Sequence, residues 1–106
     1  MTRLDIIRAR ISEFSNVKFG QRPYTAPLHH MSKEVLEAIE SGEAEEYADI
    51  LLLLLDSWSK RFPGSSTDEL LHAAESKIDI LWTRKYGEPD ENGVYEHIRT
   101  EDELDK

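Results

Sequence analysis

Hydrophobic side chains recur at intervals of three and four residues along four segments of the chain, which is the spacing of one face of an α-helix. The pattern predicts helices over residues 2–16, 26–41, 43–61 and 66–86. Glycine and proline lie between these segments, and both residues interrupt helices. The sequence therefore predicts an all-α fold, a four-helix bundle whose first connection covers residues 16–25.

The third predicted helix is hydrophobic around most of its circumference. Leu51 and Trp58 lie on one face, and Leu52 and Leu55 lie on another. A helix that is apolar nearly all round is either central in its fold or covered by a partner chain. In a chain of 106 residues, we interpret this pattern as a sign of dimerisation.

Two pairs of acidic residues flank the break between the second and third predicted helices. Glu34 and Glu37 are separated by two residues, as are Glu46 and Asp49, so each pair faces one way on its helix. The pairs are mirror images about Ser41-Gly42. An antiparallel hairpin would therefore place Glu37 level with Glu46, and Glu34 level with Asp49.

Carboxylates gathered in this way repel one another. Two of them about 6 Å apart repel by roughly 3 kcal/mol at an effective dielectric near 20. Either some become protonated, with raised pKa values, or a hard cation binds among them. Carboxylate oxygens are the ligands of Mg²⁺ or Mn²⁺, and Mg²⁺ usually arrives with substrate phosphates. The hairpin therefore predicts a magnesium site for a polyphosphate.

Chance spacing of acidic residues is the competing interpretation. The chain has 22 acidic residues, so such pairs arise often, and acids after Gly42 also favour a helix N-terminus. Asp49 is harder to explain in this way, because aspartate is a poor helix former and here it precedes the apolar run Ile50–Leu55. The mirror symmetry together with Asp49 favours the site.

Two basic residues fall on the hydrophobic stripe of the fourth predicted helix. Lys77 and Arg84 share an arc with Leu70, Ala74 and Leu81. Charged residues are uncommon on a stripe that faces a core. Their long side chains either extend along it to water or point at phosphates held by the metal. We favour the second interpretation, because a site that handles polyphosphate also needs cations.

Composition excludes several other classes of protein. The net charge of −9 argues against a general basic surface for nucleic acid. The absence of cysteine excludes disulfides, zinc thiolate sites and cysteine nucleophiles. The first residues lack a hydrophobic signal region. The longest apolar run, Ile50–Leu55, is too short to span a bilayer, so we expect no membrane as a partner. We expect one cytoplasmic domain over residues 1–106, with 87–106 as a polar tail whose acidic end frays.

The acidic pairs resemble the motif of a known superfamily, the MazG-like all-α nucleoside triphosphate pyrophosphatases. The strings Phe19-Gly20, Pro27–Glu37 and Glu46–Asp56 are similar to those of its phage-type dATP/dGTP diphosphohydrolase branch. The segment Asp90–Arg99 also resembles that branch. The resemblance thus covers most of the chain.

The resemblance implies a reaction in which water attacks the α-phosphorus of a deoxynucleoside triphosphate. The products of dGTP or dATP would be the monophosphate and pyrophosphate, and the resemblance places this reaction in phage synthesis of a 2-aminoadenine precursor. The resemblance also implies a helical bundle that forms a homodimer or a homotetramer, with the active sites near the interface between subunits. Nucleic acid is not an expected partner.

Site residues follow from the motif and the chemistry together. Glu34, Glu37, Glu46 and Asp49 are the expected catalytic residues and ligands of Mg²⁺, for which Mn²⁺ can substitute. Glu34 or Glu37 is expected to take the proton of the attacking water. The expected substrate-binding residues are Lys33, Lys77, Arg84, Phe19 and Asn16.

Two alternatives stay open at this point. A house-cleaning pyrophosphatase for dUTP or modified nucleotides would carry the same four carboxylates with a different base pocket. A non-catalytic helical interaction module would keep the bundle but would not need these carboxylates.

Overall fold

The computed structural model describes residues 1–99. This part of the chain contains helices α1 (Arg3–Phe19), α2 (Thr25–Ser41), α3 (Ala44–Arg61) and α4 (Thr67–Thr83). The predicted all-α fold class is confirmed. Backbone contacts divide the structure into two compact units, Met1–Glu69 and the residues from Leu70 onward. The single domain over residues 1–106 stays a prediction. Within the described residues, no helix is long and apolar enough to cross a membrane.

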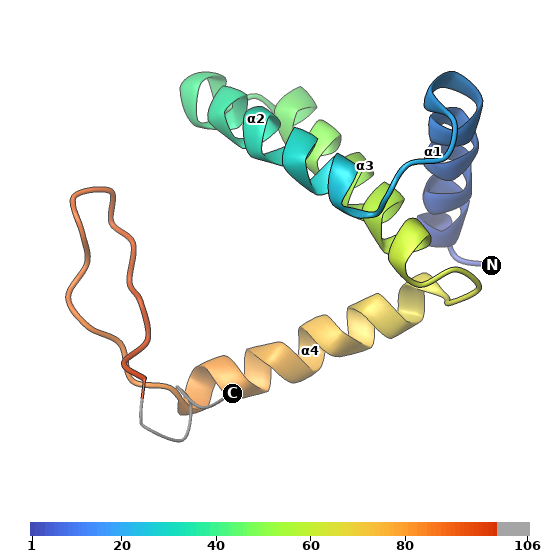
Figure 1. The fold of residues 1–106 in the computed structure, drawn as a ribbon. Helices are drawn as coiled ribbons and strands as arrows, with labels where there is room; N and C mark the ends of the chain where they lie inside the picture. The colour runs from blue at the N-terminus through green and yellow to red at the C-terminus, as the bar shows by residue number, and fades with distance from the viewer. Residues whose placement is uncertain (100–106) are drawn as a thin grey trace. The chain divides into compact units, whose positions relative to one another are not determined.

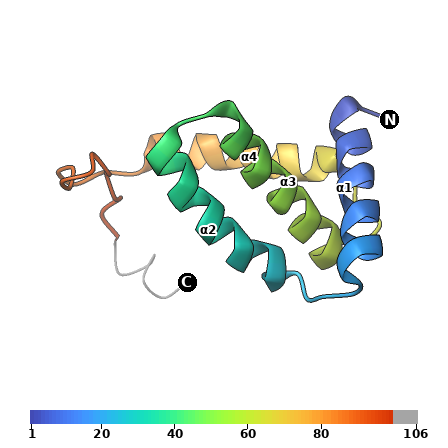
Figure 2. The same cartoon turned by 90° about the horizontal axis from the view of Figure 1, so that it is seen from above.

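Helix α3 is the centre of the first unit. It packs against α2 as an antiparallel hairpin and contacts α1 on its other side (Figures 1 and 2). Leu55 of α3 is completely buried. The predicted break between α2 and α3 is confirmed at Gly42, which has a φ of 66° and donates its N–H to the Ala38 carbonyl. This left-handed conformation ends α2 and turns the chain back, which glycine does without steric cost.

Helix α1 is longer than its sequence pattern predicts. Thr2 caps its first turn as expected, with Asp5 bonding back to Thr2 in a capping box. The expected end at residue 16 is wrong, because the helix continues to Phe19 and ends at Gly20, whose φ is 72°. No residue from 16 to 19 interrupts a helix. Asn16 consequently lies on a helix and not in a loop.

Side chains of α1 hold the connection between α3 and α4. The Arg8 guanidinium donates to the Ser59 hydroxyl at 2.8 Å and to the Ser65 carbonyl. The Asp5 carboxylate accepts the Thr67 N–H at 3.0 Å and the Thr67 hydroxyl at 2.6 Å. Asp5 therefore caps two helices, its own and the N-terminus of α4.

The second unit contains most of α4 and a returning segment. The prediction that the fourth helix reaches Tyr86 is wrong, because α4 ends at Thr83. Tyr86 instead forms an antiparallel bridge with His97. The expected turn at Asn92-Gly93 is confirmed, since Gly93 has a φ of 79° and donates its N–H to the Asp90 carbonyl at 3.0 Å.

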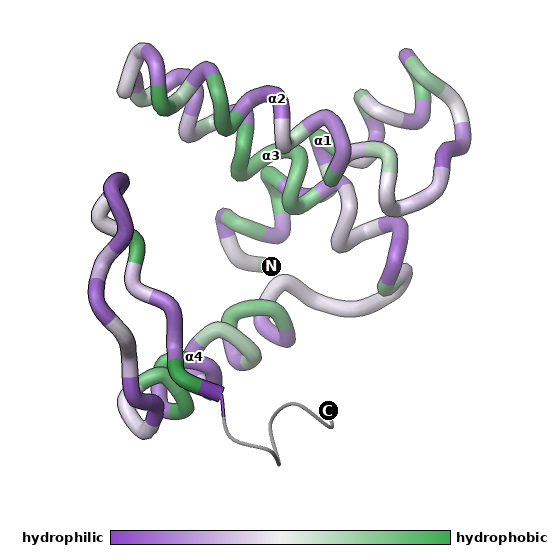
Figure 3. Tube along the Cα trace, turned by 60° about the vertical axis from the view of Figure 1, so that its left-hand side comes forward, coloured by the Kyte–Doolittle hydropathy of each residue, from purple (hydrophilic) through white to green (hydrophobic). Residues whose placement is uncertain are grey.

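Figure 3 shows that the returning segment, residues 84–98, is mostly hydrophilic. It is held by backbone hydrogen bonds, such as Gly87 N–H to the Glu96 carbonyl at 3.0 Å. Part of the predicted polar tail therefore has defined structure. The predicted fraying of the acidic end falls on residues 100–106, which lie outside the described residues.

Candidate active site

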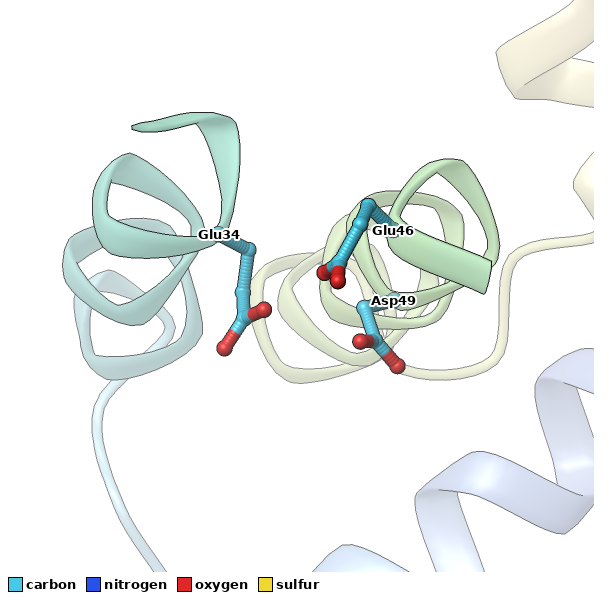
Figure 4. A group of neighbouring side chains, drawn as sticks. All are labelled: Glu34, Glu46 and Asp49. Atoms are coloured by element: carbon cyan, nitrogen blue, oxygen red, sulfur yellow. The ribbon is translucent and has the colours of Figure 1, made fainter. Parts of the chain in front are cut away.

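Three of the four predicted carboxylates converge between α2 and α3. Glu34 extends from α2 toward α3, where Glu46 and Asp49 lie one turn apart (Figure 4). One carboxylate oxygen from each of the three lies within 4.8 Å of the other two, and all three residues are half-buried. The antiparallel hairpin produces this convergence, because it brings residues on either side of Gly42 to the same level.

Glu37 lies at the edge of this group. Its side chain is exposed, and it is not among the three whose oxygens share that 4.8 Å spacing. Its carboxyl nevertheless lies close enough to those of Glu34 and Glu46 to raise the pKa of both. The expected function of Glu37 as a metal ligand or proton acceptor stays a prediction.

The crowding changes the acidity of two of these groups. The pKa of Glu34 is raised, chiefly by a hydrogen bond with the Glu37 carboxyl and then by burial and like charge. The pKa of Glu46 is raised by burial first and by the negative charge of Glu37 second. A bound cation would oppose both shifts. A donor set made only of carboxylate oxygens fits a hard divalent ion such as Mg²⁺ or Mn²⁺.

A histidine lies beside the group. The Nε2 atom of His30 is 3.0 Å from Glu34 Oε1, one helical turn earlier on α2. This hydrogen bond lowers the pKa of Glu34 and so opposes part of the effect of the neighbouring acids. It also fixes one oxygen of the Glu34 carboxylate.

A cavity of about 240 Å³ adjoins the carboxylates. Glu34, Asp49 and His30 line it together with hydrophobic residues of α1 and α3. Phe14 and Phe19 meet edge to face in this wall, with ring centroids 5.7 Å apart. The structure thus places Phe19, one of the predicted substrate-binding residues, next to the acidic group.

Asn16 does not line this cavity. It lines a separate polar hollow of about 420 Å³ together with Gln21, Arg22 and Lys60. Arg22 belongs to both linings. The expected contact of Asn16 with the substrate stays a prediction.

Asp56 lines the same cavity but is not one of the three converging carboxylates. Its side chain is only 3% exposed, and Lys60 Nζ lies 2.6 Å from Oδ1. The Ser15 hydroxyl donates to Oδ2 at 2.9 Å, and Arg22 Nη2 lies 3.5 Å from the same oxygen. Asp56 is therefore committed to a buried ion-pair network.

The three predicted phosphate-binding cations have different surroundings. Lys33 is exposed on α2, directly before Glu34. Lys77 is exposed on α4, and Arg84 is half-buried one residue beyond the end of that helix. Both belong to the second unit. Their contact with phosphate stays a prediction.

Ser15 and Arg22 were missed by the sequence analysis. The i,i+4 spacing of Asp56 and Lys60 signals an ion pair on one helix face. No comparable signal marks Ser15 or Arg22, because they meet Asp56 only through the packing of α1 and its following loop against α3.

Comparison with known proteins tests the fold and the family that the sequence indicates. A search of curated proteins gave no match. Among solved structures, the chain is similar to the cyanophage S-2L MazG-like pyrophosphohydrolase, described as bound to dGDP and three catalytic Mn²⁺ ions per active site. The two are 24% identical with a TM-score of 0.68, over 93% of this chain and 96% of that one, so the likeness confirms the MazG-like fold.

A family model identifies the family of the chain, which the similarity of fold alone does not do. The model for dATP/dGTP pyrophosphohydrolase matches residues 7–104, almost the whole chain. The matched region includes both acidic pairs of the α2–α3 hairpin and the hydrophobic wall beside them. The chain is thus a hydrolase that belongs to the dATP/dGTP pyrophosphohydrolase family.

Proposed function

We propose that this protein hydrolyses dGTP or dATP to the deoxynucleoside monophosphate and pyrophosphate with the help of Mg²⁺, for which Mn²⁺ can substitute. One observation supports this most strongly. In a chain of this family, Glu34, Glu46 and Asp49 bring their oxygens within 4.8 Å of one another between two helices. The S-2L relative, described with dGDP and Mn²⁺, is consistent with the same ligand chemistry.

Metal ions at these carboxylates would neutralise triphosphate charge and lower the pKa of water. Glu34, Glu46 and Asp49 would hold the metal from the two helices, and Glu37 would complete the set from its edge. Glu37 is exposed, so water can reach its carboxylate. Glu34 or Glu37 is the proton acceptor in this proposal.

The neighbouring cavity suits the base and sugar. Its hydrophobic wall, including Phe14 and Phe19, matches the apolar lining typical of sites for planar ligands. Lys33, Lys77 and Arg84 would stabilise negative charge on the phosphates. Asn16 would contact the substrate from the polar hollow, which shares Arg22 with the cavity.

The exposed hydrophobic residues suit an interface of a homodimer or homotetramer. The proposed location of the protein is the cytoplasm. Val17 of α1 is 74% exposed and Ile39 of α2 is 77% exposed. Leu36, three residues before Ile39 on the same helix, is 66% exposed, and exposed hydrophobic side chains that gather on a surface are usually covered by a partner. A phage role in supplying a 2-aminoadenine precursor is compatible with the proposed substrates.

The test is direct. The protein is incubated with each of the four common deoxynucleoside triphosphates and with dUTP in the presence of Mg²⁺, and the products are separated. We expect monophosphate and pyrophosphate from dGTP or dATP, and loss of turnover in Glu34→Gln. Glu40→Gln removes an exposed acid of the same helix and serves as the control. Equal turnover by Glu34→Gln and the wild type would contradict the assigned site.

A further inference from the structure

His30 lies one helical turn before Glu34 on α2, so the two side chains share a face of the helix. The Nε2 atom of His30 is 3.0 Å from Glu34 Oε1. The Glu34 side chain is only 16% exposed, whereas that of His30 is 54% exposed. The hydrogen bond thus joins an exposed ring to a largely buried carboxylate, and both residues line the 240 Å³ cavity.

The chemistry of a metal ligand decides which atom of this pair donates. A carboxylate that binds a divalent ion is ionised and offers acceptors only. The shared hydrogen must therefore belong to Nε2, and the imidazole donates it to Glu34. Within residues 1–99, no other N–H group donates to this carboxylate.

This donor acts at a place where like charges oppose the arrangement. An oxygen of Glu34 lies within 4.8 Å of oxygens of Glu46 and Asp49, and the three negative charges repel one another before a metal is bound. A glutamate side chain also loses rotational freedom when its carboxylate is fixed. The hydrogen bond from His30 offsets both effects. Because a carboxylate has about four acceptor sites, it still has sites for a cation.

We propose that His30 is a positioning residue, whose Nε2–H holds the Glu34 carboxylate toward Glu46 and Asp49 and so raises the affinity of the site for a divalent cation. His30 does not itself belong to the converging group, and carboxylate oxygen suits Mg²⁺ and Mn²⁺ better than imidazole does. This inference rests on the proposed function in one respect, because it assumes that the carboxylates bind the metal of the reaction.

The experiment measures Mn²⁺ binding, by electron paramagnetic resonance of the free ion, in the wild type, His30→Ala, His30→Gln and His29→Ala. In glutamine the amide nitrogen takes the place of Nε2, so this variant keeps a donor but loses the imidazole. His29 is the matched control, because it is exposed on the same helix and lies outside the cavity lining. Hydrolysis of dGTP at increasing Mn²⁺ gives kcat and the metal concentration for the half-maximal rate. Circular dichroism identifies the folded variants.

We expect the Kd for Mn²⁺ to rise about 10- to 100-fold in His30→Ala, the range typical when a hydrogen-bond partner of a metal ligand is removed. His30→Gln should bind Mn²⁺ nearly as tightly as the wild type, and His29→Ala should be unchanged. In His30→Ala the metal concentration for the half-maximal rate should rise in proportion to Kd, whereas kcat at saturating Mn²⁺ should change little. His30→Asn, whose amide is too short to reach Glu34, should match His30→Ala and decides the question if the alanine variant does not fold.

Two results would overturn the inference alone. One is an unchanged affinity for Mn²⁺ in the folded His30→Ala protein. The other is a His30→Gln protein that binds Mn²⁺ as weakly as His30→Ala, because the imidazole itself would then be required. A wild type that binds no Mn²⁺ would overturn the metal site of the proposed function, and this inference with it. A wild type that binds Mn²⁺ but hydrolyses no deoxynucleoside triphosphate would overturn the proposed reaction alone, and a loss of affinity in His30→Ala would still support the positioning function.

Discussion

Lys60 and Asp56 lie one helical turn apart on α3, with the Lys60 ammonium 2.6 Å from the Asp56 carboxylate and the Asp56 side chain almost fully buried. The pair separates two kinds of acid on the same helix. Asp49, two turns earlier, faces the other carboxylates, whereas Asp56 already has cationic partners. Position along α3 therefore decides which acid is available to a metal.

Replacement of Asp56 by asparagine should destabilise the fold. The change leaves Lys60 and Arg22 without their carboxylate, and removing one partner of a buried ion pair costs about 3–5 kcal/mol. Urea unfolding of the metal-free protein measures the loss. Asp79→Asn, at an exposed position of α4, should change stability by less than about 0.5 kcal/mol. Equal stability of the two variants would contradict the structural function of Asp56.

Leu55 should be the most sensitive hydrophobic position. It is completely buried where α3 meets its neighbours, and a buried leucine replaced by alanine typically costs about 2–5 kcal/mol. Urea unfolding of Leu55→Ala tests this value. Leu36→Ala is the control, because Leu36 is 66% exposed. A loss no larger than that of the control would show that α3 is not the centre of the core.

Asp5 should make the free energy of unfolding depend on pH in the acidic range. Hydrogen bonds from the Thr67 and Thr2 side chains hold the pKa of Asp5 well below its usual range. A carboxylate whose pKa is lower in the folded state stabilises the fold at pH values above its unfolded pKa, which is about 3.9 for aspartate. This stabilisation is lost as the pH falls toward the folded pKa.

Asp5→Asn should therefore be less stable than the wild type at pH 7, and the difference should shrink as the pH is lowered below about 4. Unfolding free energies measured between pH 7 and pH 3 test this trend. A difference that stays constant with pH would show that the charge of Asp5 does not contribute.

Glu46→Gln should raise the stability of the metal-free protein. The pKa of Glu46 is raised by burial and by neighbouring acids, so its charged form disfavours the folded state. The stabilisation from the neutral form is present below the unfolded pKa and is lost as the pH rises through the folded pKa. At pH 7 a neutral glutamine removes this repulsion.

The same variant should lose stabilisation by metal. Thermal unfolding with a chelator should give a higher midpoint for Glu46→Gln than for the wild type, while added Mg²⁺ should raise only the wild-type midpoint strongly. Glu45→Gln, an exposed neighbour, should respond to Mg²⁺ as the wild type does. A Glu46→Gln protein that is less stable without metal would contradict the repulsion among these acids.

The α2–α3 hairpin was predictable because its geometry is local. Two regular helices and one glycine turn determine which residues are level, so the spacing of Glu34 and Asp49 about Gly42 was sufficient to predict their convergence.

The buried network was not predictable from spacing alone. Arg22 reaches Asp56 from a loop, 34 residues earlier in the chain, and only tertiary packing determines that contact. The end of α4 was misplaced for a related reason. No helix-breaking residue precedes Gly87, but the pairing of Tyr86 with His97 ends the helix sooner.

Anomalous diffraction at the manganese edge tests the central claim most directly, on crystals grown with Mn²⁺ and a non-hydrolysable dGTP analogue. We predict manganese peaks among the oxygens of Glu34, Glu46 and Asp49, with the phosphates of the analogue on the same ions. Side chains turned toward solvent with no manganese between them, while the analogue is bound elsewhere, would contradict the account.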